Sequence, residues 1–347
     1  MDRGINKLVV FIAVISGFGG FLFGFDSSVV ANIQDQVMQQ LSLSTWQWSK
    51  VVSFSLLGAI LGIPLSGLIA DRLSRRSLLR IVALGFILGT CLSAKANDLT
   101  ILLCGRFLIG VCIGIASYIS PLFIAEIAPP QKRGALILIN GLAITFGQAI
   151  AYLIGYFFHD LSPSSWRFII GLGIFPALIL LIGMFFVPHS PAWLMKRYGE
   201  EKALGVLKKI RSQEANLHNE LNDIVANITA HSRLNKRLLL KPKILSLLLV
   251  GTALGIFQQF SGINAIMYYG PVIFESAGFF PVRNAILATF WIGLLNFMFT
   301  AVTLLFVDKL GRRTLLLYGT LLASISLFAV SFLFKFDLAF KSIGTLI

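Results

Sequence analysis

The sequence predicts an all-α integral membrane protein, because apolar residues dominate it and occur in long runs with little charge. Hydrophobic residues make up 56% of the 347 residues, charged residues make up 13%, and the mean hydropathy is +0.84. A water-soluble domain of this size does not contain so much apolar surface. Each run is also long enough to cross the hydrocarbon core of a bilayer as a helix.

Nine apolar runs define the transmembrane helices that we expect. They lie at residues 8–31, 47–70, 78–96, 99–125, 134–158, 167–187, 244–270, 284–307 and 314–336. The first run is too long for the core of a signal peptide and has no cleavage site after it, so we interpret it as a helix.

A polar insert separates the sixth run from the seventh and divides the chain. Within it, Glu200–Arg211 and Ala215–Ile228 carry apolar residues at helical spacing, which predicts short amphipathic helices on the cytoplasmic surface. We therefore expect a six-helix bundle at 1–187, a cytoplasmic helical linker at 188–243, and a partial second bundle of three helices at 244–347.

The basic residues indicate topology. The formal net charge is +14, but most of the 29 Lys and Arg residues fall in alternate loops, on the side that also holds the N-terminus. Cytoplasmic loops carry this excess of positive charge, so we expect a cytoplasmic N-terminus in the cell inner (plasma) membrane and no nucleic-acid partner. The sequence shows no metal-ligand spacing and no catalytic set, so we expect no metal, no cofactor and no enzymatic activity.

Two loops repeat the same pattern. Asp71-Arg-Leu-Ser-Arg-Arg-Ser-Leu-Leu79 follows the second run, and Asp308-Lys-Leu-Gly-Arg-Arg-Thr-Leu-Leu316 follows the eighth. This match predicts a parallel duplication of six helices, with a substrate site near the membrane midplane between the halves. The second half contains three runs, so a complete duplication needs about three more helices, and we expect a C-terminally truncated chain.

Two opposite charges lie inside the apolar runs at similar depth. Asp26 is about 18 residues into the first run from the inside, and Arg106 is about seven residues into the fourth from the outside, at ~1.5 Å per residue. An isolated charge within a membrane is costly, so we expect the two to pair. The alternatives are that Arg106 reaches the outer interface and that Asp26 makes a structural helix contact.

The seventh run carries an unusual set of polar side chains. Gln258, Gln259 and Asn264 lie in it together with Tyr268 and Tyr269. Neutral amides donate and accept hydrogen bonds, which suits a neutral polyhydroxylated ligand better than an ion. The alternative is that these amides only connect packed helices.

Further polar and aromatic residues are expected near the midplane. Gln148 lies about 14 residues into the fifth run and Asn296 about 12 residues into the eighth, at the ~1.5 Å rise of a helix. Phe23 and the two tyrosines offer apolar ring faces, although lipid contact or core packing is the better explanation for any single Phe in a chain that has 30.

These motifs together resemble the sugar porter family of the major facilitator superfamily, in particular the bacterial proton-coupled xylose, arabinose and hexose symporters. The stretches that carry the resemblance are Gly20–Asp26, Gly67–Arg76, Gly105-Arg106, Ser120–Gly134 and Gly255–Pro271. The resemblance implies a major facilitator fold of two six-helix bundles, of which this chain holds about nine of twelve helices.

The resemblance also implies roles for individual residues. Asp26 would be the proton-coupling acid, with Arg106 as its partner. The sugar would contact Gln148, Gln258, Gln259 and Asn264, with Asn296, Tyr268, Tyr269 and Phe23 around it. Salt bridges that close the cytoplasmic side would involve Asp71, Arg72, Arg75, Arg76, Glu126, Arg133, Asp308, Arg312 and Arg313.

One motif departs from the family. Where the family has Pro-Glu-Ser-Pro-Arg-Trp-Leu, this chain reads Pro188-His-Ser-Pro-Ala-Trp-Leu194, so His189 and Ala192 replace the acid and the base of a cytoplasmic salt-bridge network.

The sequence therefore predicts transport of a pentose or hexose by proton-coupled symport and alternating access. The alternatives are a non-transporting truncated remnant and a membrane sugar sensor or a facilitator without proton coupling. The expected partners are a monosaccharide, a proton and the lipid bilayer, and we expect a monomer.

Overall fold

The computed structural model describes residues 6–70, 72–211, 217–232 and 242–335, and within these ranges the regular structure is entirely helical. The helices of the first half are α1 (Lys7–Gln40), α2 (Thr45–Ala70), α3 (Arg75–Ala94), α4 (Leu99–Ile127), α5 (Arg133–Phe158), α6 (Ser165–Gly171) and α7 (Ile174–Phe186), with the 3-10 turns η1 (Pro130–Lys132) and η2 (His159–Leu161) flanking α5. The described residues include nine helical segments that are long and apolar enough to cross a membrane, as predicted.

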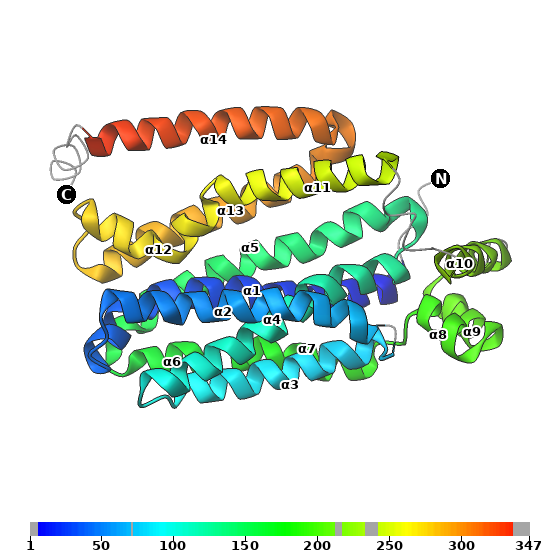
Figure 1. Ribbon diagram of the computed structural model, residues 1–347, viewed down its shortest axis with the longest axis horizontal. Helices are drawn as coiled ribbons and strands as arrows, with labels where there is room; N and C mark the ends of the chain where they lie inside the picture. Colours follow the sequence, from blue (N-terminus) through cyan, green and yellow to red (C-terminus); the bar gives the residue numbers. More distant parts are fainter. Residues whose placement is uncertain (1–5, 71, 212–216, 233–241, 336–347) are drawn as a thin grey trace.

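The remaining helices form the linker and the second half. The linker contains α8 (Pro191–Tyr198), α9 (Glu200–Ile210) and α10 (Leu217–Ser232), and it is followed by α11 (Pro242–Phe260), α12 (Ile263–Ser276), α13 (Val282–Leu310) and α14 (Arg312–Lys335). Figure 1 shows α8–α10 at one end of the elongated bundle, and we call this the linker end. The helices α11–α14 lie along one side of the bundle (Figure 1).

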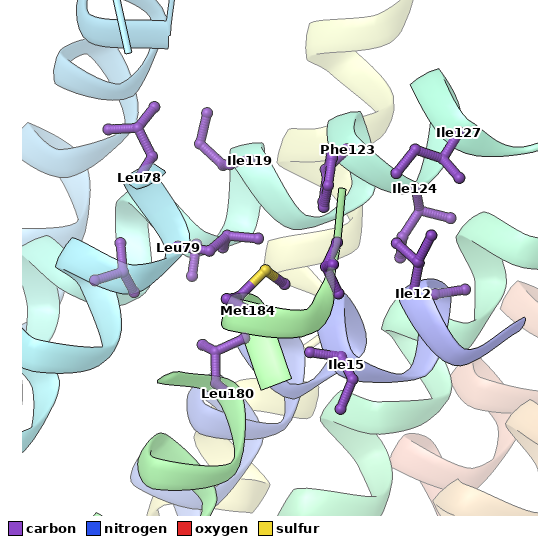
Figure 2. Packing of buried hydrophobic residues seen from close by; sticks show 14 of the residues in the cluster. Ile12, Ile15, Leu78, Leu79, Ile119, Phe123, Ile124, Ile127, Leu180 and Met184 are labelled. Atoms are coloured by element: carbon purple, nitrogen blue, oxygen red, sulfur yellow. The ribbon is translucent and has the colours of Figure 1, made fainter. Parts of the chain in front are cut away.

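The first half packs around α1 and α4. α1 contacts α4, α5 and α7, while α4 also contacts α2 and α3. Figure 2 shows how the core forms at these contacts, where Ile12 of α1, Leu79 of α3, Phe123 of α4 and Met184 of α7 meet, each fully excluded from solvent. Lipid is as apolar as these side chains, so close van der Waals packing stabilises the contacts more than removal from water does.

Glycines allow α1 and α5 to approach closely. A Cβ built on Gly24 of α1 would lie 1.8 Å from the carbonyl oxygen of Ile144 in α5. A Cβ on Gly147 of α5 would lie 2.5 Å from the carbonyl oxygen of Phe21 in α1. Any larger residue at either position would force the two backbones apart. This small-residue contact aligns α1, which carries Asp26, against α5, which carries Gln148.

The structure corrects three of the expected helix boundaries. α1 continues nine residues beyond Ala31 to Gln40, because its last turns are polar and hydropathy does not detect them. The sixth span is interrupted between α6 and α7, where Pro176 lacks the N–H that would bond to Leu172. The seventh span is interrupted at Gly262, which has a φ of +80°, and resumes as α12.

The linker contains the two predicted amphipathic helices and a third that was not predicted. α9 and α10 match the expected segments to within a few residues. The additional helix, α8, begins at Pro191, and the hydroxyl of Ser190 accepts a hydrogen bond from the backbone N–H of Trp193 at 3.3 Å. Ser190 is therefore a side-chain N-cap that starts the helix immediately after α7.

The second half contacts the first mainly through α12 and α13. α13 packs along α5, and α12 packs against both α1 and α13. Ala31 of α1, Tyr152 of α5 and Met267 of α12 form a small buried cluster there, and the Tyr152 hydroxyl donates a hydrogen bond to the carbonyl oxygen of Met267. This contact joins the two halves of the chain at the C-terminal thirds of α1 and α5.

Candidate functional site

The most deeply buried charges of the first half form an ion pair. Asp26 of α1 is 5% exposed and Arg106 of α4 is 2% exposed. The guanidinium binds the carboxylate through two parallel hydrogen bonds, Nη1 to Oδ1 and Nη2 to Oδ2, the second at 2.8 Å. The predicted contact is therefore present, and neither residue reaches the membrane interface alone. Such a bidentate arrangement fixes both distance and orientation.

Two features make this pair more than a surface salt bridge. The Nε of Arg106 is buried and has no hydrogen-bond partner among the described residues. Tyr268 of α12 lies close enough to both charges to interact with them electrostatically. The pair thus belongs to the first half, and a side chain of the second half lies close to it. The contacts of Asp26 and Arg106 do not test a role in proton coupling, so that role remains a prediction.

Two of the predicted amides meet across the contact between the halves. The side-chain Nδ2 of Asn296 in α13 donates to the Oε1 of Gln148 in α5 at 3.4 Å. Gln148 is buried, and Asn296 is half-buried. Amides that satisfy each other in this way can exchange that hydrogen bond for bonds to a ligand hydroxyl at little cost.

The amides of the seventh span are arranged around its interruption. The Nδ2 of Asn264 in α12 donates to the Oε1 of Gln259 in α11 at 2.6 Å. Gln258 and Gln259 are both exposed, whereas Asn264 is half-buried. Among the described residues these amides therefore do not form one cluster with Gln148 and Asn296. Their assignment as sugar ligands stays a prediction.

The predicted aromatic residues lie in different surroundings. Tyr268 packs against the core that contains Phe21 and Phe25, and Tyr269 is half-buried beside it. Phe23 is half-buried and packs against the other core cluster, which is consistent with a packing role. Tyr268 also lies close enough to Asp26 and Arg106 to interact with both charges, so it is well placed to line a site there.

The charges at the linker end pair only partly as expected. Glu126 of α4 accepts hydrogen bonds from Nε and Nη2 of Arg75 at 3.1 and 2.9 Å. Arg76 donates instead to the carbonyl oxygen of Phe185 at 3.0 Å. The reason is helical geometry, because consecutive residues at the start of α3 point about 100° apart and only Arg75 faces α4.

The remaining predicted gating residues are exposed or lie outside the described part of the chain. Arg72, Arg133 and Arg313 are exposed in the described part of the chain. Asp71 lies outside the described residues, as do the side chains of Asp308 and Arg312. The closing role of this set remains a prediction.

A cavity of about 810 Å³ opens at the linker end. Arg75, Glu126 and Arg133 line it from the first bundle, and Trp193 of α8 and Asp223 of α10 line it from the linker. Its volume falls in the range of small-molecule sites.

The two residues that depart from the family motif lie near this end. His189 stacks on Trp193 with ring centroids 5.2 Å apart, and its Nδ1 is buried without a hydrogen-bond partner among the described residues. Burial, together with the nearby Arg76 and Arg80, lowers the pKa of His189 below its usual value. Ala192 lines the cavity and supplies no charge.

Sequence reasoning missed a polar column between α1 and α5. Asn32 donates to the carbonyl oxygen of Ala151 at 2.8 Å, Tyr152 reaches Met267, and His159 contacts Asp35. The signal was present in the spacing, because Gln148, Tyr152 and His159 lie at intervals of four and seven residues, which aligns them along α5 and its continuation into η2. Across the described residues, no group of three or more His, Cys, Asp or Glu is arranged to hold a metal ion.

Comparison with known proteins identifies the family. The family model described as "Sugar (and other) transporter" matches residues 11–346. The chain belongs to this family of sugar transporters. The glucose transporter GlcP of Staphylococcus epidermidis is 36% identical over 327 residues, which cover 94% of this chain and 72% of that protein. The galactose-proton symporter of Escherichia coli is 33% identical over 319 residues, covering 92% of this chain and 68% of that protein.

A solved structure of a sugar transporter has the same architecture as this chain. The proton:xylose symporter XylE bound to 6-bromo-6-deoxy-D-glucose matches with a TM-score of 0.80 and 30% identity, over 89% of this chain and 71% of that one. The predicted all-α major facilitator fold of the sugar porter type is thereby confirmed. The chain spans a smaller share of some relatives, such as 56% of the probable inositol transporter 2 of Arabidopsis thaliana.

Proposed function

We propose that this sugar transporter family member moves a monosaccharide across the membrane together with a proton, with Asp26 as the proton-binding group. The observation that carries the proposal is the buried, bidentate Asp26–Arg106 pair. Relatives named as a galactose-proton symporter and a proton:xylose symporter support it. From the excess of basic residues in the loops of the linker end we infer that this end, and the N-terminus, face the cytoplasm.

The pair can couple a proton to a conformational change. A proton on Asp26 removes the carboxylate charge, so the contact with Arg106 loses its charge assistance and the guanidinium is held less strongly and can bind other acceptors. Tyr268 of α12 lies close to this site. Protonation therefore changes the surroundings of a side chain in the second half, and a change that favours one arrangement of the halves shifts their equilibrium.

The sugar would bind beside this pair. Gln148 and Asn296 come from opposite halves and already share a hydrogen bond. A sugar hydroxyl that replaced this bond would contact both halves at once. Gln258, Gln259 and Asn264 would complete the site when α11 moves toward the first half. Binding would then depend on the arrangement of the halves, as alternating access requires.

The test is uptake of radiolabelled xylose, glucose and arabinose by a transport-deficient bacterial strain that expresses this chain, with and without a protonophore. We expect protonophore-sensitive accumulation of at least one sugar. Asp26→Asn should abolish accumulation but retain counterflow, whereas the control Glu201→Gln, on the exposed face of α9, should change neither. Gln148→Ala should weaken apparent affinity about tenfold, the effect of losing one hydrogen bond to a ligand.

The outcomes separate the alternatives. Accumulation by the Asp26→Asn variant equal to that of the unmodified chain would exclude Asp26 as the coupling group. Sugar binding without uptake by the unmodified, membrane-inserted chain would contradict transport and favour a sensor. Uptake that a protonophore does not affect would favour a facilitator.

A further inference from the structure

A buried histidine lies between two carboxylates at the end of the bundle away from α8–α10. His159, in the turn η2 that follows α5, is 6% exposed. Its Nδ1 lies 2.7 Å from Oδ1 of Asp160, and its Nε2 lies 3.1 and 3.2 Å from the two carboxylate oxygens of Asp35 in α1. Figure 1 shows the α5–α6 connection opposite the linker helices.

This geometry suits the doubly protonated ring. A neutral imidazole has one N–H and one lone pair, whereas both ring nitrogens of an imidazolium donate. With a carboxylate oxygen at hydrogen-bond distance from each nitrogen, the neutral ring would point its lone pair at an acceptor. The imidazolium satisfies both contacts with charge-assisted hydrogen bonds.

The charged groups around the ring are accounted for among the described residues. Asp35 approaches from α1 and Asp160 from η2 itself. The nearest basic residue of α6, Arg167, is directed to the carbonyl oxygens of Ala94 and Ala96 at 3.0 and 2.7 Å. From α13, Arg283 donates to the carbonyl oxygen of Tyr156 at 3.1 Å. No described cation therefore competes for the two carboxylates.

The same site holds the end of α1 in place. The amide of Gln36 donates to the carbonyl oxygen of His159 at 2.5 Å and accepts from the backbone N–H of Trp166 at 3.0 Å. One turn later, Gln40 accepts from the indole N–H of Trp166 and donates to the hydroxyl of Ser164 at 3.1 Å. α1 is thus tied by side-chain hydrogen bonds to η2 and α6, and the His159–Asp35 contact lies at the centre of this connection.

We propose that His159, Asp35 and Asp160 form a second proton-binding site, separate from Asp26 and open to the external medium. The bound proton keeps the imidazolium between the carboxylates and so holds the outer end of α1 against η2 and α6. When external alkaline pH removes this proton, the ring can bind only one of the two carboxylates. The outer end of α1 is then released.

Release of the outer end of α1 would affect transport because α1 contacts the second half at this level. Ala31 of α1 packs against Met267 of α12 about one turn before Asp35. The position of α1 at this level therefore sets the outer contact of the two halves. This effect on transport rests on the proposed function, whereas occupation of the site by a proton does not.

The first test reads the proton directly, on the full chain purified in lipid nanodiscs with ¹⁵N-labelled histidine. The chain has four histidines, and the signal of His159 is identified by its loss in His159→Gln. If that variant does not fold, the three other histidines are replaced instead. We expect both ring nitrogens of His159 to carry protons at pH 7.5. A neutral ring at that pH would overturn the proposal.

The partner carboxylates provide a second arm of this test. Asp35→Asn together with Asp160→Asn removes both negative charges while keeping the side-chain size. The pH at which the His159 ring loses its proton should fall by about one unit or more. An unchanged titration in a folded double variant would also overturn the proposal.

The second test reads the consequence for transport. Sugar counterflow in proteoliposomes, with equal pH on both sides, should slow about tenfold as pH rises through the His159 transition, if loss of a charge-assisted contact limits the rate. The fall in counterflow rate with rising pH should be absent in His159→Gln and present in Asp26→Asn. The same fall in counterflow rate in His159→Gln would contradict the link to transport. Absence of counterflow at every pH would refute the proposed function and leave the ¹⁵N result standing.

Discussion

In the first half Asp26 and Arg106 are 5% and 2% exposed and bind each other, whereas Gln258 and Gln259 of α11 are exposed. The two halves do not differ comparably in hydrophobicity. The six spans up to Phe186 have mean hydropathies of 1.8 to 2.6, and the three later spans 1.6 to 2.0. Burial differs far more, with 28 to 67% of the first set buried against 0 to 22% of the second.

The comparison shows that hydropathy and packing carry different information. Hydropathy indicates that a segment can cross a membrane, and all nine segments meet that condition. Packing decides whether a polar group inside the membrane has a partner. In the first half, close helix contacts create sites where a charge can be held. Sites of that kind are absent from the described part of α11, where side chains have few protein neighbours.

Removal of Arg106 should give the largest loss of stability, and it tests whether polar groups of the first half depend on partners more than those of α11 do. Arg106→Met keeps most of the side-chain volume but leaves Asp26 buried without its partner, which costs about 3–5 kcal/mol of stability. We expect a large fall in the melting temperature of the purified protein. The matched change in the second half, Gln258→Met, should alter stability by less than about 0.5 kcal/mol, as surface substitutions do.

A double variant distinguishes an unpaired charge from lost packing. Asp26→Asn with Arg106→Met removes both charges and should recover much of the stability lost in Arg106→Met alone. Equal destabilisation in the single and double variants would show that the guanidinium acts through packing. A destabilised Gln258→Met variant would show that α11 is buried in the working protein.

The ion pair illustrates what the sequence could predict. The position of Asp26 and Arg106 within their apolar runs was enough to place both at one depth, because helix rise is constant. The two sequence-related loops predict a duplicated architecture, and this stays a prediction because Asp71 and the side chains of Asp308 and Arg312 lie outside the described residues. These inferences depend only on spacing along single helices.

Other features depend on contacts that spacing does not determine. Gly262 ends α11 because it adopts a positive φ, and other glycines in the same segment, such as Gly251, do not. Which arginine reaches Glu126 depends on the rotation of α3 about its axis. His159 lies in a short connection and gives no hydropathy signal. Its two carboxylates come from different elements, so only the fold brings them together.

A pair of glycine substitutions tests the difference in packing directly. A Cβ on Gly24 would lie 1.8 Å from a backbone oxygen, whereas a Cβ on Gly251 of α11 would have no atom within 4 Å. Gly24→Ala should therefore destabilise the protein by about 1–3 kcal/mol through overpacking. Gly251→Ala should be neutral or stabilise by up to about 1 kcal/mol, because alanine favours the helix.

Thermal unfolding of both variants in the same lipid would measure the difference. The opposite order, with Gly251→Ala the more damaging, would mean that α11 is closely packed and that the two halves are equally well buried. Similar small effects would show that α1 and α5 can separate without loss of stability.

The smallest effect is expected at His189, which follows the last helix of the first half and whose Nδ1, like several other polar atoms, is buried without a hydrogen-bond partner in the described chain. Burial, Arg76 and Arg80 hold the pKa of this imidazole below 6.5 in the folded protein. As pH falls, His189 therefore takes up a proton more readily in the unfolded chain than in the folded protein. The stability that neutral His189 contributes is present above pH 6.5 and is lost as pH falls. Relative to His189→Gln, the unmodified protein should lose about 1 kcal/mol or less between pH 7.5 and 5.5, since the ring is only partly buried.

The sign of this dependence is the sharper test, because a structural role alone would lower stability equally at both pH values. Melting temperatures of the unmodified protein and of His189→Gln would be compared at pH 7.5 and 5.5. His189→Glu provides the matched change, since a carboxylate beside Arg76 and Arg80 should stabilise the protein at pH 7.5 and lose that advantage on acidification. If acidification instead stabilised the unmodified protein relative to His189→Gln, the ring would have found an acidic partner. His189 would then be paired in the folded protein, as Asp26 and Arg106 are.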